Sequence, residues 1–185
     1  MAKTIYYLAA SLDGFLARPD GNLDWLMGFE GHEQANVDVT PQDAYADLMA
    51  RTGVLVTGSG TYEWVMDREG DWPYELPTFL FTTREPQIPD GRDVRIVSGE
   101  VADHHADILA AAGEGDIWLI GGGSLAIQFQ RAGLIDELHL TVVPVVLGEG
   151  IPTFAGDING ELELIGSRVY SRGMVELRFR LPGTD

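Results

Sequence analysis

One stretch decides the fold of this 185-residue sequence, and it reads Ile117-Trp118-Leu119-Ile120-Gly121-Gly122-Gly123-Ser124-Leu125. The apolar run at its start is typical of a buried strand. The three glycines let the backbone turn sharply, and a ligand can approach them because they carry no Cβ. The residues that follow, 125–132, are expected to form a helix whose first N–H groups suit a phosphate or pyrophosphate. The stretch predicts a strand, a tight turn and a helix, and the turn is either an anion site or a plain connection.

Two further strand ends carry a similar signal. The first places glycines and hydroxyls between a short strand and a helix start, in Val54-Leu55-Val56-Thr57-Gly58-Ser59-Gly60-Thr61. The second ends a strand with two hydroxyls and a cation, in Leu80-Phe81-Thr82-Thr83-Arg84. A guanidinium there either clamps a phosphate through paired hydrogen bonds or pairs with Glu85 or another surface carboxylate. Ligands bind at the carboxyl ends of parallel strands, so the three strand ends together predict a dinucleotide site.

The order of elements predicts the fold class. Strands are expected near residues 5–10, 54–56, 78–82, 94–97, 116–120 and 137–146, and helices near 41–51, 62–66, 101–112 and 125–132. The last third differs, because 162–170 and 174–181 alternate around the turn Arg172-Gly173 and predict a hairpin. We therefore expect one α/β domain over residues 1–185, with a mostly parallel mixed sheet flanked by helices and a C-terminal antiparallel hairpin.

Composition excludes several classes of function. The chain has 29 acidic and 12 basic residues, a formal net charge of −17, which argues against binding to nucleic acid or to an anionic membrane surface. It contains no cysteine, and its four histidines show no metal-ligand spacing, so no metal site is expected. No apolar run reaches the roughly 18 residues of a membrane span. We expect a cytoplasmic protein with a small-molecule substrate.

Three side chains are candidates for a role in substrate chemistry. Asp43 and Asp47 lie four residues apart, on one face of the helix that Thr40-Pro41 begins. Either carboxyl group can act as a proton donor if desolvation raises its pKa; the alternative is a solvated acidic face. Trp25 belongs to an expected long loop, where it either covers a ligand or fills the core.

The sequence resembles the dihydrofolate reductase-like superfamily. Within it, the chain is most similar to the branch of the C-terminal reductase domain of the riboflavin-biosynthesis deaminase–reductase. The resemblance rests on Ala9-Ala10-Ser11-Leu12-Asp13-Gly14, on residues 56–62 and 80–84, on Ile120-Gly121-Gly122-Gly123-Ser124-Leu125, and on residues 135–148. These motifs follow the order of the family from residue 5 to about 154, and as a set they are specific.

The resemblance implies NADPH as cofactor and a homodimer. By position, the cofactor-binding residues would be Ala10, Asp13, Gly14, Gly58, Ser59, Gly60, Thr61, Thr82, Thr83, Arg84, Gly121, Gly122, Gly123, Ser124 and Leu125. Among them, Arg84 would meet the 2′-phosphate, and Asp13-Gly14 would open a mobile loop over the nicotinamide. Asp43 matches the acid that protonates the pterin in folate reductases, Asp47 is the second candidate, and Trp25 would contact substrate.

The substrate implied first is the pyrimidine of 5-amino-6-(5-phosphoribosylamino)uracil reductase. Two alternatives stay open: a folate-type pterin reductase, and a nucleotide-binding module without turnover. The sequence departs from the riboflavin branch where Gly121 replaces the usual glutamate and where Asp24 precedes the loop tryptophan.

Overall fold

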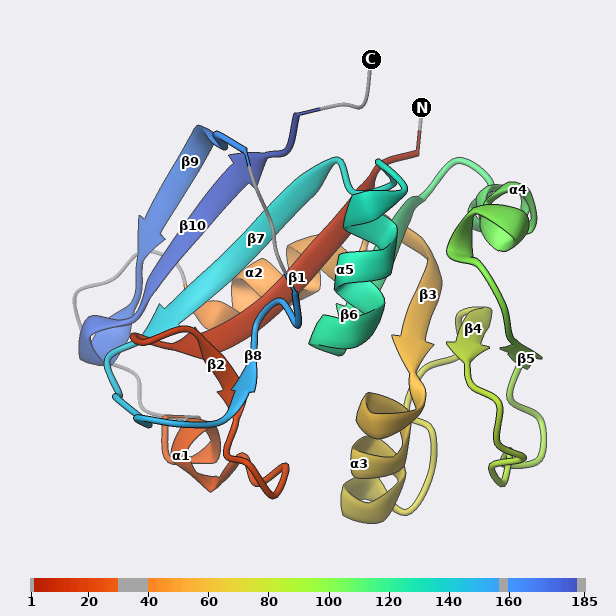
Figure 1. Ribbon diagram of the computed structural model, residues 1–185, viewed down its shortest axis with the longest axis horizontal. Helices are drawn as coiled ribbons and strands as arrows, with labels where there is room; N and C mark the ends of the chain where they lie inside the picture. The colour runs from red at the N-terminus through yellow and green to blue at the C-terminus, as the bar shows by residue number, and fades with distance from the viewer. Residues whose placement is uncertain (1, 30–39, 157–159, 183–185) are drawn as a thin grey trace.

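The computed structural model describes residues 2–29, 40–156 and 160–182, and it joins strands from both ends of the chain in one sheet (Figure 1). This sheet has eight strands in the order β5-β4-β3-β6-β1-β7-β10-β9, and a second, small sheet pairs β2 with β8. The strands are β1 Thr4–Ser11, β2 Phe15–Ala17, β3 Thr52–Gly58, β4 Thr78–Phe81, β5 Val94–Val97, β6 Asp116–Gly121, β7 Glu137–Val143, β8 Ile151–Pro152, β9 Glu163–Val169 and β10 Val175–Arg180. The helices are α1 Asp24–Met27, α2 Pro41–Met49, α3 Ser59–Glu69, α4 Val101–Ala112, α5 Gly123–Arg131 and the 3₁₀ turn η1 Ser171–Gly173.

The expected fold class is confirmed. Neighbouring strands from β5 to β7 all run parallel, and β10 and β9 add the antiparallel hairpin. The differences are local. β3 and α3 are longer than predicted, β7 stops at Val143 because Pro144 has no N–H to give the ladder, and the α1, β2 and β8 segments were not predicted.

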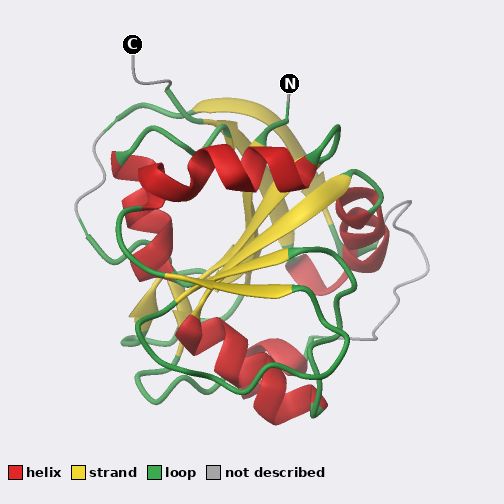
Figure 2. Ribbon diagram, turned by 90° about the vertical axis from the view of Figure 1, so that its right-hand side faces the viewer, coloured by secondary structure: helices red, strands yellow, loops and turns green. Residues whose placement is uncertain are grey.

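Alternation along the strands divides the core between the two faces of the sheet, and helices cover both (Figure 2). In β1, Tyr6 and Leu8 pack with residues of α4 and α5, whereas Ile5 packs with Leu48 of α2 and with α3. Because the strands are parallel, the carboxyl ends of β4, β3, β6 and β1 lie along one edge. The sheet therefore brings the three predicted strand ends together.

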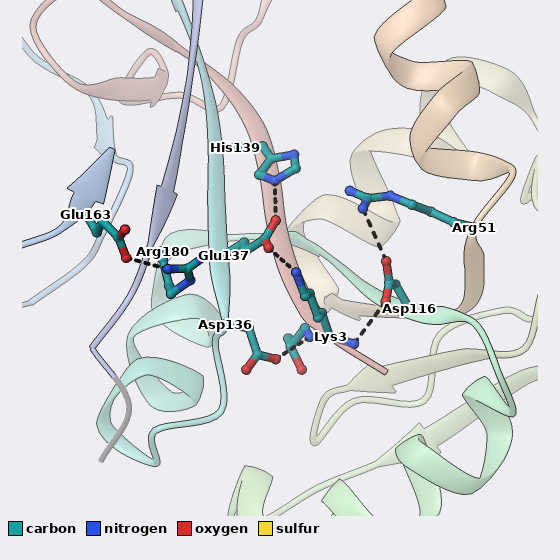
Figure 3. A network of polar contacts seen from close by, with 9 residues as sticks. Lys3, Arg51, Asp116, Asp136, Glu137, His139, Glu163 and Arg180 are labelled. Atoms are coloured by element: carbon teal, nitrogen blue, oxygen red, sulfur yellow. Dashed lines mark hydrogen bonds and ion pairs between the residues drawn. The ribbon is translucent and has the colours of Figure 1, made fainter. Parts of the chain in front are cut away.

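A polar network fixes the opposite, amino-terminal end of the strands (Figure 3). Glu137 on β7 accepts one hydrogen bond from Lys3 Nζ and contacts His139 Nε2 at 2.9 Å. The Lys3 N–H donates to Asp116 on β6, and the Thr4 N–H donates to Asp136. These contacts join the start of β1 to both of its neighbouring strands.

The buried histidine in this network predicts sensitivity to acid. Burial lowers the pKa of His139 from 6.5, and it outweighs the opposing effect of Glu137. Below about pH 6.5 the unfolded chain therefore takes up the His139 proton more readily than the folded protein does. We expect the free energy of unfolding to fall as pH drops below 6.5, by at most about 1.4 kcal/mol per pH unit for this one group.

Urea unfolding at about pH 7.5 and about pH 5.5 tests this, with His139→Gln as the comparison. The variant should lose less stability between the two pH values than the wild type, because glutamine does not titrate. Equal losses in the two proteins would show that His139 is not the group responsible.

Candidate functional site

The glycine turn after β6 needs its glycines for two different reasons. Gly121 has φ +127°, a conformation that side chains rarely adopt. A Cβ on Gly123 would lie 2.6 Å from the carbonyl oxygen of Pro152, so this glycine lets α5 pack against the β8 segment. Gly122 is the N-cap of α5, and no side chain caps the helix. No side-chain cap therefore satisfies the first N–H groups of α5.

The second turn lies directly beside the first. Gly58 ends β3 and is the N-cap of α3, again with no capping side chain. Thr57 pairs with Gly121 in the sheet, and its hydroxyl donates to the Gly121 carbonyl at 3.4 Å. Next to it, a Cβ on Gly60 would meet nothing within 4 Å. Two uncapped helix starts therefore lie side by side at the carboxyl edge of the sheet.

Arg84 joins the third strand end to this pair. Its Nη2 donates to Ser59 Oγ at 2.7 Å, and its Nη1 lies 2.8 Å from a carboxylate oxygen of Glu63 on α3. Its own N–H donates to Thr82 Oγ1 at 3.0 Å, which shapes the turn after β4. The surface ion pair weighed for Arg84 exists, with Glu63 as partner, yet the side chain is 61% exposed. The guanidinium stands at the edge, oriented by its contacts and open to solvent.

The end of β1 carries the other expected cofactor contacts. Asp13 accepts hydrogen bonds from the Ser11 hydroxyl at 2.6 Å and from the Gly148 N–H at 2.7 Å, and these bonds lower its pKa to about 2. Gly14 has φ +86°, and its carbonyl accepts from Thr153. Ala10 is 1% exposed, so in this structure neither its side chain nor its backbone offers a ligand appreciable surface. Asp13 and Gly14 tie this turn to the segments that follow β7.

The two candidate acids are not desolvated. Asp43 closes a capping box with Thr40: its carboxylate accepts from the Thr40 N–H at 2.8 Å, and its own N–H donates to Thr40 Oγ1. These bonds lower the pKa of Asp43, which is the opposite of what a proton donor near neutral pH needs. Asp47 is 70% exposed and lies 3.7 Å from Arg168. Both carboxylates therefore belong to a solvated acidic helix face. The proton-donor role stays a prediction that this geometry does not favour.

The capping box carries a prediction of its own. Asp43→Ala should lower the free energy of unfolding by about 1 kcal/mol, because it removes half of the reciprocal cap. It should leave the affinity for nicotinamide nucleotides unchanged. Urea unfolding and nucleotide titration of the same sample measure the two effects, and Asp47→Ala is the control that spares the cap. If Asp43→Asn abolished turnover without loss of stability, Asp43 would be a proton donor after all.

Trp25 is more deeply packed than an expected loop residue. It belongs to α1, is 8% exposed, and packs against Ala44, Val143, Tyr170 and Met174. Of the two expectations for Trp25, the structure favours the one in which its ring fills the core. Its Nε1–H has no hydrogen-bond partner among the residues that the structure describes, which leaves one buried donor beside the start of α2.

Sequence reasoning missed a polar layer on the sheet beneath α2. Glu176 on β10 is fully buried, and it accepts hydrogen bonds from the Tyr170 hydroxyl and from Arg178. Burial, together with the charge of Glu176, raises the pKa of Tyr7 to about 12. The available signal was polar alternation on paired strands: Thr141 lies opposite Glu176, and His139 lies opposite Arg178.

The described residues show neither a cluster suited to a metal ion nor a helix suited to crossing a membrane. Within 2–29, 40–156 and 160–182, no group of three or more His, Asp or Glu side chains is arranged to hold a metal ion, and His32 lies outside these ranges. In the same ranges, no helix has both the length and the apolar character needed to cross a bilayer.

The mixed sheet, with glycine turns at its carboxyl edge, defines a dihydrofolate reductase-like α/β protein. In fold, the chain matches a dihydrofolate reductase from Enterococcus faecalis complexed with NADP(H), with a TM-score of 0.62 at 18% identity over 97% of each chain. More particularly, the chain belongs to the RibD C-terminal domain family, whose model matches residues 2–176.

Two proteins are similar over nearly their whole length. The uncharacterized protein YwjB of Bacillus subtilis is 32% identical over 173 residues, which cover 93% of this chain and 94% of YwjB. The crystal structure of a putative riboflavin biosynthesis protein from Shewanella sp. PV-4 has a TM-score of 0.78 at 33% identity, and the match covers 98% of this chain and all of that one. The family resemblance expected from the motifs is confirmed.

Proposed function

We propose that the protein is an NADPH-dependent reductase of a small heterocyclic substrate. The observation that supports this best is the meeting of three strand ends at one edge: the Gly58–Thr61 turn, the Gly121–Ser124 turn and Arg84. A Cβ on Gly60 would meet no atom within 4 Å, both helix starts lack capping side chains, and Arg84 is exposed. These features fit a dinucleotide with two phosphate groups and a further 2′-phosphate.

Each group at the edge has a separate task in this proposal. The first turns of α3 and α5 would bind the pyrophosphate, and Arg84 would bind the 2′-phosphate that distinguishes NADPH from NADH. When bound, NADPH supplies a hydride at the carbon opposite its ring nitrogen. The chain itself would position the substrate beside the end of β1, next to the reacting carbon of the cofactor. The substrate proposed first is a riboflavin-type pyrimidine, and a pterin is the alternative.

A nucleotide-binding module without turnover is the second candidate. The observation in its favour is the state of the two acids, because Asp43 caps a helix and Asp47 is solvated. The two candidates share the cofactor site and differ in hydride transfer. Loss of nicotinamide absorbance in the presence of pyrimidine ribosides or pterins would support the reductase, and saturable NADPH binding without turnover on either class would support the module.

Gly60→Ala tests where the cofactor binds. Nothing lies within 4 Å of the added Cβ, and alanine favours the first turn of α3, so stability should stay the same or rise by up to about 1 kcal/mol. NADPH affinity should nevertheless fall by roughly tenfold or more, since the methyl group occupies the space proposed for the pyrophosphate.

Gly28→Ala, at the C-cap of α1, is the matched control, because Gly28 has a φ of −63° and an added Cβ would make only ordinary contacts. Nucleotide titration, followed by nicotinamide fluorescence, measures both variants against the wild type. Unchanged NADPH affinity in Gly60→Ala would remove the α3 turn from the cofactor site. Failure of the folded wild-type protein to bind NADPH at all would overturn the proposed function.

A further inference from the structure

A groove of about 500 Å³ lies between α2 and the segment that precedes β4. Its lining consists of Tyr45, Met49, Pro73, Tyr74, Glu75 and Leu76. Five of these six residues are apolar or aromatic, and the sixth, Glu75, is charged. None of the sequence motifs for the cofactor contributes to it, so its chemistry must be considered on its own.

The two tyrosine rings of the groove are held in place by Trp118 of β6. The ring of Tyr45 lies 5.7 Å from that of Trp118, and the ring of Tyr74 lies 5.6 Å from it, both close to edge-on. Tyr74 also packs at 5.1 Å against Trp72, which is fully buried. Rings fixed in this way present aromatic surface to a ligand without a large loss of side-chain entropy.

Charge around the groove is negative. Glu75 lines it, and Glu69 acts on the neighbouring Tyr74 hydroxyl, whose pKa is raised by burial first and then by Tyr45 and Glu69. The nearby cations are engaged: Arg92 binds Asp71, and Arg68 contacts Glu69. The lining itself contains no basic residue, and Arg92, the cation whose charge acts on Glu75, is already paired with Asp71, so the groove offers little to compensate for a phosphate or carboxylate.

The groove lies along the same strand as the glycine turn. Trp118 precedes Gly121 by three residues of β6, which corresponds to about 10 Å at the rise of a parallel strand. A substrate whose reacting ring lies at the carboxyl edge can therefore reach the groove with its other end.

We infer that the groove binds the non-reacting end of the substrate and that this end is an organic cation, held by the rings of Tyr45 and Tyr74 and by the carboxylate of Glu75. The statement that the ligand is a substrate rests on the proposed function. The preference for a cation rests on the groove alone. Aromatic faces attract a positive charge, and a carboxylate beside them adds to that attraction. An anionic end, such as the phosphate of a phosphoribosyl pyrimidine, would meet the carboxylate of Glu75, and the nearby cation Arg92 is already paired with Asp71. Among the heterocyclic substrates proposed above, the inference therefore favours one that carries no phosphate at this end.

Three one-ring probes of equal size test the preference: benzylammonium, benzyl alcohol and benzoate. Ligand-observed NMR titration at low salt gives their affinities. We expect benzylammonium to bind roughly three- to tenfold more tightly than benzyl alcohol, and benzoate to bind most weakly. Glu75→Gln should remove the advantage of benzylammonium over the alcohol, and Tyr74→Leu should weaken both. Glu100→Gln, an exposed carboxylate at the start of α4, should change nothing.

The inference is overturned if benzoate binds as tightly as benzylammonium, if no probe binds, or if the order of affinities survives Glu75→Gln. Glu75→Gln alters an exposed side chain, so the test does not depend on whether Tyr74→Leu folds. NADPH titration of the same samples keeps the two proposals separate. The expected probe order without NADPH binding would overturn the proposed function alone, and NADPH binding with the reverse order would overturn the inference alone.

Discussion

Arg84→Ala is expected to weaken the binding of NADPH by roughly ten- to a hundredfold, about 1.5–3 kcal/mol, and to leave NADH affinity nearly unchanged. The guanidinium is exposed at the edge of the sheet and is oriented by Ser59 and Glu63. A charge-assisted contact to the 2′-phosphate is lost in the variant, and Glu63 is then left facing that phosphate without a counter-ion. Parallel titrations with NADPH and NADH measure the difference.

Two variants sharpen this test. Arg95→Ala removes another exposed arginine, which lies on the edge strand β5 and pairs with Asp93, and it should change neither affinity. Glu63→Gln should raise NADPH affinity, because it frees Arg84 from its ion pair. An equal loss for both nucleotides in Arg84→Ala would show that the residue stabilises the turn and does not select the 2′-phosphate.

Glu176→Ala is expected to lower the free energy of unfolding by about 3–5 kcal/mol. Glu176 is fully buried on β10, where it accepts hydrogen bonds from Tyr170 and Arg178. Its removal leaves a largely covered guanidinium without its carboxylate and a buried hydroxyl without its acceptor. Urea unfolding followed by tryptophan fluorescence measures the change.

The hairpin supplies its own control. Glu163 on β9 pairs with Arg180 on β10, and both side chains are more than half exposed. Glu163→Ala removes an ion pair of the same chemical type but from solvent, so it should cost no more than about 1 kcal/mol. Similar losses in the two variants would contradict the buried role that we assign to Glu176.

The cofactor edge was predictable because its signals are local. Glycines after Ile120 and after Thr57, and an arginine after Thr83, each follow an apolar strand, and the order of elements predicts that these strands are parallel. Parallel strands end at one edge, so the meeting of the three turns follows from topology. The fold class and the family were confirmed for the same reason.

The substrate side was less predictable. The spacing of Asp43 and Asp47 places them on one helix face, but it does not show whether that face is exposed to solvent or buried. Asp43 proved to be the partner of Thr40 in a capping box, a pattern that the residues Thr40-Pro41-Gln42-Asp43 contain. Trp25 became a core residue because α1 packs it against Tyr170 and Met174, far along the chain.

The sequence by itself determined the parallel sheet, the C-terminal hairpin and the glycine turns, because strand alternation and glycine conformation depend on near neighbours. Only the tertiary structure decided the partners of the charged groups. Arg84 meets Ser59 across 25 residues, and Lys3 meets Glu137 across 134. Burial and ion pairing arise only when distant segments pack against one another. Burial sets the direction of the pKa shift of His139, and ion pairing sets the charge of the groove beside Trp118.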